Sequence, residues 1–265
     1  MTVPAAEPAS RLSLDRVTLR YETDRGSAVA VDRISFEVAP AERLVLLGPS
    51  GCGKSTLLKA IGGFIQPAEG TILAQGRPIA APGPDRMMVF QEFDQLLPWK
   101  TVRGNVMFPM QASRGLDTAT AGARADRIIE RVGLSGFGQA YPHTLSGGMK
   151  QRVAIARALA LEPAVLLMDE PFGALDAMTR RRMQDELLGL WEELRFTLVF
   201  VTHSIDEAML VGSRILVLTR APARLRATAE VGGLGEASRQ SPEFAEMSRR
   251  LRGFFSDANG LDDAA

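Results

Sequence analysis

The segment 48–55, Gly-Pro-Ser-Gly-Cys-Gly-Lys-Ser, has the spacing G-x-x-x-x-G-K-[ST] that is typical of loops that bind phosphate groups. It follows an apolar run at 44–47 and precedes a helix-like run, so the loop has the strand and helix that it needs on either side. Glycines let backbone N–H groups turn inward, and the helix directs its positive end at the anion. The sequence therefore predicts a polyphosphate site formed by Gly48, Pro49, Ser50, Gly51, Cys52, Gly53, Lys54, Ser55 and Thr56.

Within this loop the residue types indicate separate roles. We expect Lys54 to reach the β and γ phosphates of a nucleotide, and the Ser55 hydroxyl to join Mg²⁺. Thr56 would help to close the hydrogen bonding of the loop. The alternative is a glycine-rich turn that binds no ligand. Such a turn can match the motif by chance, but chance matches become rarer when a strand before the loop and a helix after it are also required.

Polar side chains directly follow three further apolar runs, 87–90, 165–168 and 198–201. Parallel sheets bind ligands beyond the carboxyl ends of their strands, so these residues are candidates for the same site. The sequence therefore predicts that the phosphate loop is joined by Gln91, Asp169, Glu170 and His203.

These four side chains suit phosphate chemistry. Asp169 would hold Mg²⁺ or its water together with Ser55, and Gln91 would contact the metal and the water. Glu170 would accept a proton from an attacking water or orient it, and His203 would donate a hydrogen bond to the γ-phosphate. The alternatives are solvated turn residues, helix caps, or polar groups satisfied near a strand end.

Composition sets bounds on these hypotheses. The chain has 265 residues, 46% of them apolar and 23% charged, and its 31 basic residues balance its 31 acidic ones, so nucleic acid is not an expected partner. The one cysteine, Cys52, lies in the phosphate loop, where a small filler role is expected rather than catalysis, and a reducing compartment is indicated. Residues 1–10 do not look like a secretory signal, and no apolar run reaches the length of a membrane span.

The order of predicted elements indicates an α/β fold with a parallel sheet, an N-terminal antiparallel β region and an inserted helical subdomain. Strands are expected at 17–21, 35–38, 44–47, 71–74, 87–90, 165–168, 198–201 and 215–218, and helices at 54–61, 176–194, 204–211 and 242–255. A turn is expected around residues 24–26. The predicted parts are 1–91 and 162–220 for the α/β core, 92–161 for the helical subdomain, and 221–265 for a C-terminal strand, helix and frayed acidic tail.

The segment 145–152, Leu-Ser-Gly-Gly-Met-Lys-Gln-Arg, resembles the signature motif of the ATP-binding cassette (ABC) ATPases. It precedes a strand that ends in Met168-Asp169-Glu170-Pro171, and with the phosphate loop, Gln91, residues 173–176 and His203 the resemblance covers about 14–220 in the order of that family. It implies an ABC ATPase fold and ATP hydrolysis with Mg²⁺. Two departures are Met149 in place of the usual Gln and Gly173 in place of the usual Ser.

The residues Ser146, Gly147 and Gly148 open a predicted helix at 149–159, so a hydroxyl and backbone N–H groups would form a second anion site. If the resemblance to the family is left aside, these residues are simply a helix N-cap. The resemblance implies that this site closes over the γ-phosphate bound by a second copy of the chain, in a head-to-tail dimer with Asp176 at its seam. It also assigns Tyr21 to stacking on adenine, and the alternative for Tyr21 is packing in the core.

Within the family, Gln91 to Trp99 with Thr101, Val102, Asn105 and Val106 resembles the importer ATPases of the nitrate, sulfonate and taurine group. The resemblance implies a permease as partner, docked at 93–99, and through it a periplasmic or extracellular solute-binding protein. The alternative for Leu96, Leu97 and Trp99 is that they cover the core of the helical subdomain. It places the chain at the cytoplasmic face of the plasma membrane. Rival hypotheses are a small-molecule kinase, which has no use for 145–148, and a soluble ABC-type ATPase that acts on nucleic acid or ribosomes.

Overall fold

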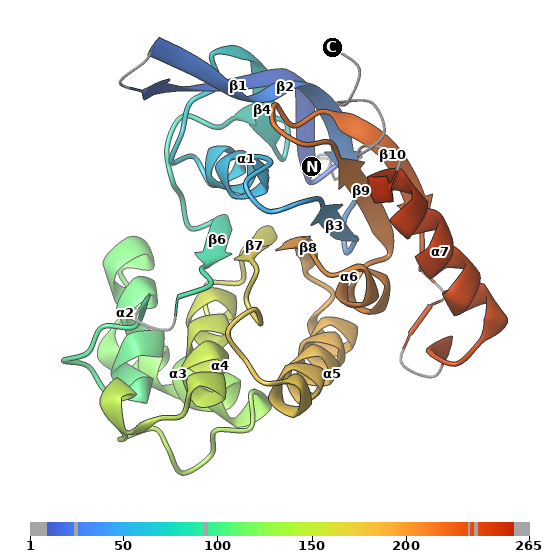
Figure 1. Ribbon diagram of the computed structural model, residues 1–265. Coiled ribbons are helices and arrows are strands. Elements are labelled where there is room, and N and C mark those ends of the chain that lie inside the picture. The colour runs from blue at the N-terminus through green and yellow to red at the C-terminus, as the bar shows by residue number, and fades with distance from the viewer. Residues whose placement is uncertain (1–9, 24–25, 93–94, 233, 236–237, 257–265) are drawn as a thin grey trace, which may run out of the picture. The chain divides into compact units, whose positions relative to one another are not determined.

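The structure is a computed structural model, and the chain divides into two units (Figure 1). Unit 1 comprises Met1–Pro82 and Thr197–Ala265, and unit 2 comprises Gly83–Phe196. The residues described are 10–23, 26–92, 95–232, 234–235 and 238–256. Residues 24–25 of the turn predicted at 24–26, residues 93–94 of the predicted docking segment and the predicted acidic tail at 257–265 lie outside them. The predicted helical subdomain, 92–161, falls within the sequence range of unit 2.

Unit 1 begins with the predicted antiparallel β region. Its strands pair in the order β2-β1-β4-β5, with bounds β1 Leu12–Thr23, β2 Gly26–Val38, β4 Glu69–Ala74 and β5 Arg77–Pro78. β1 and β2 are longer than the predicted strands because bulges carry the pairing past two arginines, Arg16 and Arg33, both at φ 48°. The Arg16 N–H donates to Ser35 Oγ at 2.7 Å, and the Arg33 N–H donates to the Thr18 hydroxyl at 3.3 Å.

The second sheet of unit 1 carries the predicted phosphate loop. Its strands pair in the order β10-β9-β3-β8, with bounds β3 Arg43–Leu47, β8 Thr197–Thr202, β9 Arg214–Leu218 and β10 Leu225–Glu230. β3 runs parallel to β8 and β9, and β8 is buried along its whole length. Such strands must be covered on both faces by other elements.

Among the described residues of unit 1, these sheets are accompanied by the helices α1 (Lys54–Ile61), α6 (Ile205–Val211) and α7 (Pro242–Ser256). α1 contacts β8 as well as β1 and β2, so it lies between the two sheets of the unit (Figure 1). α6 packs on β3 and β8, and α7 packs on α6. None of the helices in the described part of the chain is long and apolar enough to cross a membrane.

Unit 2 combines a parallel strand pair with helices. β6 (Arg86–Val89) lies parallel to β7 (Val165–Asp169), and the helices are α2 (Val102–Arg114), α3 (Thr118–Arg131), α4 (Gly147–Leu159) and α5 (Ala177–Leu194), with a short 3₁₀ turn, η2, at Pro142–Thr144. α2, α3 and α4 contact one another, and α4 packs on β6. The parallel strands and helices of the two units agree with the predicted α/β fold.

A single buried amide organises the segment before α2. The Asn105 side chain is fully buried, and its oxygen accepts a hydrogen bond from the Leu97 N–H at 2.8 Å. Its nitrogen donates to the carbonyl oxygens of Leu97, Lys100 and Thr101, each at 3.1 Å. Asn105 therefore satisfies backbone groups at both ends of the segment 97–101, which has no strand or helix of its own to do so.

We expect Asn105→Ala to lower the free energy of unfolding by about 2–4 kcal/mol, because it leaves several backbone groups without their partner. Urea unfolding followed by circular dichroism measures the loss. Gln111→Ala is the matched control, because this exposed amide lies on the same helix and donates to the Thr118 hydroxyl at 3.3 Å. An equal loss of unfolding free energy in the two variants would show that the buried hydrogen bonds of Asn105 contribute no more to stability than an exposed amide.

Candidate functional site

The phosphate-loop segment joins β3 to α1 within unit 1. Gly51 and Gly53 have φ values of 75° and 111°, in the left-handed region that favours glycine. A β-carbon at Gly53 would lie 2.6 Å from the carbonyl oxygen of Ala30 on β2, which no side chain tolerates. Glycine at 53 is therefore required both by the backbone conformation and by the close contact with β2.

Lys54 places a positive charge in this loop. The residue is buried, and its ammonium group donates to the carbonyl oxygens of Gly48 and Pro49, both at 2.8 Å. Gly53, which precedes α1, has no side chain that could cap the first N–H groups of the helix. A helix N-terminus with a lysine held across its loop attracts an anion, and phosphate is the anion that this arrangement suits.

His203 follows β8 next to this loop. The last residues of the two strands, Leu47 and Thr202, are register partners, so His203 comes one position beyond the strand end beside the start of the loop. The buried Thr202 hydroxyl donates to the Glu207 carboxylate and accepts from the Ser204 N–H at 3.0 Å. Ser204 Oγ in turn accepts from the Glu207 N–H at 3.3 Å, which caps α6. These bonds fix the turn that carries the exposed His203.

In unit 2 the carboxyl ends of β6 and β7 lie side by side, with Val89 opposite Met168. Asp169 is the last residue of β7, and Glu170 follows it at φ 42°, which turns the chain sharply. The Gly173 N–H donates to the Glu170 carbonyl at 3.1 Å, and a β-carbon at 173 would lie 3.2 Å from the side-chain nitrogen of Gln91. Unit 2 therefore brings Gln91 beside the turn that carries Glu170, and glycine at 173 leaves room for the amide.

Two residues that the sequence analysis missed hold the segment of Gln91. The Gln95 side chain accepts from the Phe90 N–H at 3.2 Å and donates to the Phe90 carbonyl at 2.8 Å, as a neighbouring strand would. Arg157 on α4 donates to the Gln95 carbonyl at 2.7 Å, and burial lowers the pKa of its guanidinium group. These bonds connect α4 to the residue that precedes Gln91. No sequence pattern marks a loop glutamine or a helical arginine for this role.

The segment 146–148 begins α4 and lies beside the start of α5. The Ser146 hydroxyl accepts from the Met149 N–H at 3.3 Å, so it is a helix N-cap. A β-carbon at Gly148 would lie 3.1 Å from the methyl group of Thr179 on α5. Ser146 itself is exposed. The cap and the predicted anion site use the same helix end, so the capping role is compatible with the predicted one.

Asp176 is the N-cap of α5. Its carboxylate accepts from the N–H groups of Met178 and Thr179, both at 3.0 Å, and the bond from Thr179 is the main reason why the pKa of Asp176 is lowered. Asp176 is exposed, and Met178 beside it is 84% exposed. Both side chains are therefore accessible at the start of α5.

Tyr21 lies on β1 opposite Ala28, and it is 53% exposed. The alternative of core packing is therefore not what the structure shows, and the ring is accessible to a planar ligand. Tyr21, the phosphate loop and His203 belong to unit 1, whereas unit 2 carries Gln91, Asp169, Glu170, Ser146 to Gly148 and Asp176. The convergence of both sets on one nucleotide stays a prediction.

The donors predicted for a metal ion are a hydroxyl, an amide and a carboxylate, from Ser55, Gln91 and Asp169. The described residues include no group of three or more His, Cys, Asp or Glu side chains that could hold a metal ion by themselves. Oxygen donors of mixed type, completed by phosphate and water, suit Mg²⁺ better than a transition metal.

Comparisons with known proteins bear on the family of the chain. A family model described as ABC transporter matches residues 31–173. The nitrate import ATP-binding protein NrtD of Synechococcus elongatus is 47% identical over 80% of this chain and 77% of its own length. The taurine import ATP-binding protein TauB of Rhizobium johnstonii is 42% identical over 96% of this chain and all of its own.

Solved structures that match this chain belong to the same family. The dimeric structure of MJ0796, described as a bacterial ABC transporter cassette, matches with a TM-score of 0.73 and 32% identity, over 84% of this chain and 99% of its own. A second structure of the same cassette, in a dimeric post-hydrolysis state bound to ADP and Pi, matches equally well. The predicted family and fold class are thereby confirmed.

We expect Gly53→Ala to weaken ATP binding at least about tenfold, because the added methyl group forces the loop away from Ala30. Gly26→Ala is the matched control, since Gly26 has φ 112° but nothing within 4 Å of the added carbon. It should lose about 1–2 kcal/mol of stability from backbone strain and keep the affinity of the parent chain. Titration with a fluorescent ATP analogue measures the affinity of both variants. Equal affinities in the two variants would contradict a role for the contact.

Proposed function

The chain belongs to the ABC transporter family of ATPases, and on that premise we propose that it is the ATP-hydrolysing subunit of a membrane importer for a small solute. The observation that carries the proposal is the phosphate loop, in which the Lys54 ammonium is held by two loop carbonyls beside the start of α1. The relatives named as nitrate and taurine import ATP-binding proteins support import as the process that hydrolysis drives.

In unit 1 the loop would bind the phosphates of ATP. Backbone N–H groups around Gly51 and Gly53 and the start of α1 donate to phosphate oxygens, and Lys54 shifts from the loop carbonyls to the β and γ phosphates. His203, fixed by the turn after β8, donates to the γ-phosphate as its charge develops. Tyr21 supplies an exposed ring for adenine, with little discrimination between bases.

In unit 2 the residues after β6 and β7 would act on the attacking water. Glu170 orients the water and takes its proton, and Gln91 positions the water from the neighbouring strand end. The left-handed backbone at Glu170 directs the chain out of the sheet at this residue. In a head-to-tail dimer, Ser146, Gly147 and Gly148 of one copy close over the γ-phosphate bound by the other, with Asp176 and Met178 at the seam.

Mg²⁺ fits the donor set of Ser55, Gln91 and Asp169, because it prefers oxygen ligands and keeps several waters. When bound, it would neutralise charge on the phosphate oxygens. The residues of the chain would bind the phosphates, orient the attacking water and exclude other water from the site. Its three protein donors come from the two units, so their joint ligation is part of the proposal.

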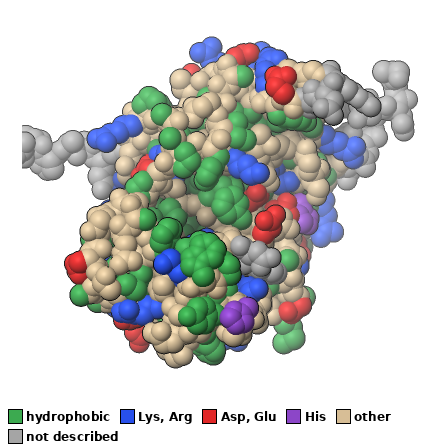
Figure 2. All heavy atoms as spheres, turned by 90° about the vertical axis from the view of Figure 1, so that its left-hand side faces the viewer, with side chains coloured by type: hydrophobic (Ala, Val, Ile, Leu, Met, Phe, Trp, Pro, Cys, Tyr) green, Lys and Arg blue, Asp and Glu red, His purple; other side chains and the backbone are tan. Residues whose placement is uncertain are grey.

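The surface at Leu96 to Trp99 would dock a short helix of a permease. Leu96 is buried, Trp99 is 70% exposed, and Asn105 holds the backbone between them and α2. Next to this segment the Lys100 ammonium lies 5.4 Å from the centre of the Phe108 ring, which is 43% exposed. Figure 2 shows that hydrophobic side chains gather on one face of unit 2. Exposed aromatic side chains of this kind are typical anchors in protein interfaces.

Such docking places the chain at the cytoplasmic face of the plasma membrane, and a periplasmic or extracellular solute-binding protein would deliver the cargo to the permease. The cargo would be nitrate, a sulfonate, taurine or a similar small solute. The site of this chain binds nucleotide and not cargo, so the choice among them rests on the named relatives.

We expect Glu170→Gln to lower ATP hydrolysis at least about 100-fold, because the amide cannot take a proton from water. ATP binding should persist, and gel filtration with ATP should show a stable dimer. The matched control is Glu162→Gln, since Glu162 has a similar left-handed backbone at φ 48° in the same unit but pairs with Arg124. Hydrolysis at the parent rate in Glu170→Gln would remove Glu170 from its role.

We expect Trp99→Ala to weaken the affinity for the purified permease about tenfold or more, since an exposed aromatic anchor is lost. Pull-down or surface binding with the permease in detergent measures it, and ATP binding by the isolated variant reports its folding. Leu225→Ala, at a 40% exposed apolar residue of unit 1, is the control. Unchanged permease binding in Trp99→Ala would place the docking surface elsewhere.

The cargo is tested with the parent chain reconstituted with the permease and each solute in turn. ATP hydrolysis should be faster with the cargo of this transporter than with the other solutes.

A further inference from the structure

Both ends of the phosphate loop lie against the backbone of other strands of unit 1. A β-carbon at Gly48 would lie 3.3 Å from the carbonyl oxygen of Leu218, the last residue of β9. At the other end, a β-carbon at Gly53 would lie 2.6 Å from the carbonyl oxygen of Ala30 on β2. β9 and β2 belong to different sheets, so the ladder of neither sheet sets the distance between these two supports.

The turn formed by Thr219–Arg224, which we call the 219–224 turn, connects the two supports. It begins directly after Leu218, and its Ala223 N–H donates to the Ala30 carbonyl at 2.8 Å. The Asp32 N–H donates back to the Ala223 carbonyl at 2.9 Å, and Val31 forms a parallel bridge with Ala223. The carbonyl that faces Gly53 is therefore the same one that the turn binds.

The turn is also closed on itself. The Thr219 N–H donates to the Arg224 carbonyl at 3.0 Å, and the Thr219 hydroxyl accepts from the Arg224 N–H at 3.0 Å. Its first and last residues are thus held together, and a displacement of Arg224 would be felt at Thr219 and at Leu218 before it.

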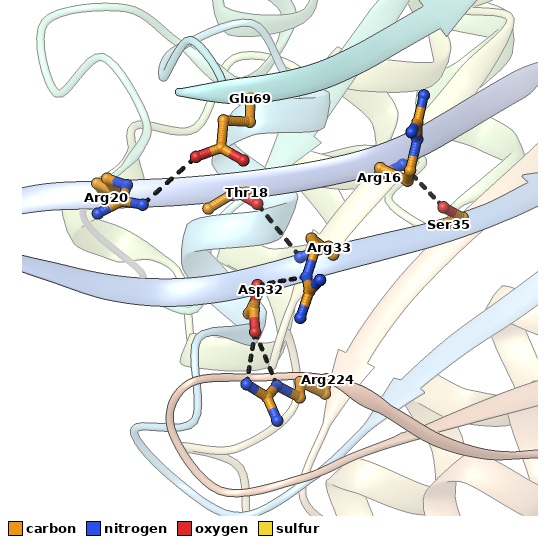
Figure 3. Close-up of polar contacts among 8 residues, drawn as sticks. All are labelled: Arg16, Thr18, Arg20, Asp32, Arg33, Ser35, Glu69 and Arg224. Atoms are coloured by element: carbon orange, nitrogen blue, oxygen red, sulfur yellow. Dashed lines mark hydrogen bonds and ion pairs between the residues drawn. The ribbon is translucent and has the colours of Figure 1, made fainter.

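An ion pair fastens this turn to β2 (Figure 3). Arg224 contacts one oxygen of the Asp32 carboxylate through Nε at 2.8 Å and Nη2 at 2.7 Å, and Arg33 Nε donates to the other oxygen at 3.2 Å. The Asp32 side chain is only 18% exposed, so water competes for it less than for a fully exposed carboxylate. The hydrogen bond from Arg224 lowers the pKa of the Asp32 carboxyl group. On the β1 side, the Arg33 N–H bonds Thr18 and fixes β2 there.

We infer that the Arg224–Asp32 ion pair is a positioning element of the nucleotide site, which holds the 219–224 turn on β2 and so keeps the supports of Gly48 and Gly53 at the spacing that the phosphate loop needs. This inference rests on the proposed binding of ATP by residues 48–55. The two side chains act through the backbone of Ala30 and Leu218 and not on the nucleotide. Without the pair the loop is less well ordered before binding, so affinity for ATP falls, while Glu170 and Gln91 of unit 2, which would act on the attacking water, are unchanged.

The test measures the Kd of the full chain for a fluorescent ATP analogue and for MgATP, together with KM and kcat for hydrolysis. We expect Asp32→Asn and Arg224→Gln to raise Kd and KM roughly fivefold to tenfold with kcat within about twofold of the parent. The double variant should bind ATP no less tightly than the single variant with the lower affinity, because the two substitutions remove the same interaction. Arg224→Lys, which keeps the charge, should recover part of the affinity.

The matched control is Glu69→Gln, which removes the carboxylate of another cross-strand pair of unit 1, with Arg20 at 3.4 Å, that does not involve the 219–224 turn (Figure 3). Its affinity should equal that of the parent chain. Parent affinity in Asp32→Asn and Arg224→Gln, additive effects in the double variant, or an equal loss in Glu69→Gln would each overturn the inference. Asp32→Asn preserves the shape of the side chain and decides the case if an Arg224 variant fails to fold. A parent chain that binds no ATP would refute the proposed function itself, which separates the two failures.

Discussion

The close approach of the Gly53 backbone to the Ala30 carbonyl is the constraint on which the nucleotide site depends. At 2.6 Å from a β-carbon position there is no room for any side chain, and the left-handed φ of Gly53 also favours glycine. This contact brings the start of α1 against a second sheet, so the helix end is supported from both sides. Backbone N–H groups that must bind a charged ligand need such support, because an ordered loop loses less entropy when the ligand binds.

The parts of the fold that the sequence predicted best are those whose signal is local. The predicted helix at 54–61 has those bounds in the structure, and the end of the strand at 165–168 moves by one residue, because an apolar strand next to a glycine loop or an acidic pair has clear ends. The N-terminal strands were predicted too short. The bulges at Arg16 and Arg33 break the alternation of apolar and polar residues, and no periodic pattern survives a change of register.

The supporting residues of the site could not be predicted in the same way. Gln95 pairs with the backbone of Phe90, and Arg157 reaches Gln95 from 62 positions away in the chain. Asp32 and Arg224 are separated by 192 positions. Their residue types are common on protein surfaces, and only the folded chain brings them together. The chemistry of a phosphate site is therefore visible in sequence, because it needs rare residue combinations, whereas the bonds that hold it in place use ordinary ones.

The two departures from the family pattern have different physical consequences. Gly173 lies against the Gln91 amide, where a β-carbon would come within 3.2 Å, so a serine at this position would have to move the amide or the turn that bears Glu170. Met149 supplies only its backbone N–H to the Ser146 cap, which any residue except proline could do. By helix geometry the N–H groups of Gly147 and Gly148 have no acceptor within α4, so the cap leaves the helix end suited to an anion. The exchange at 149 therefore leaves the helix cap unchanged, whereas the glycine at 173 determines how closely the residues after β6 and β7 can approach each other.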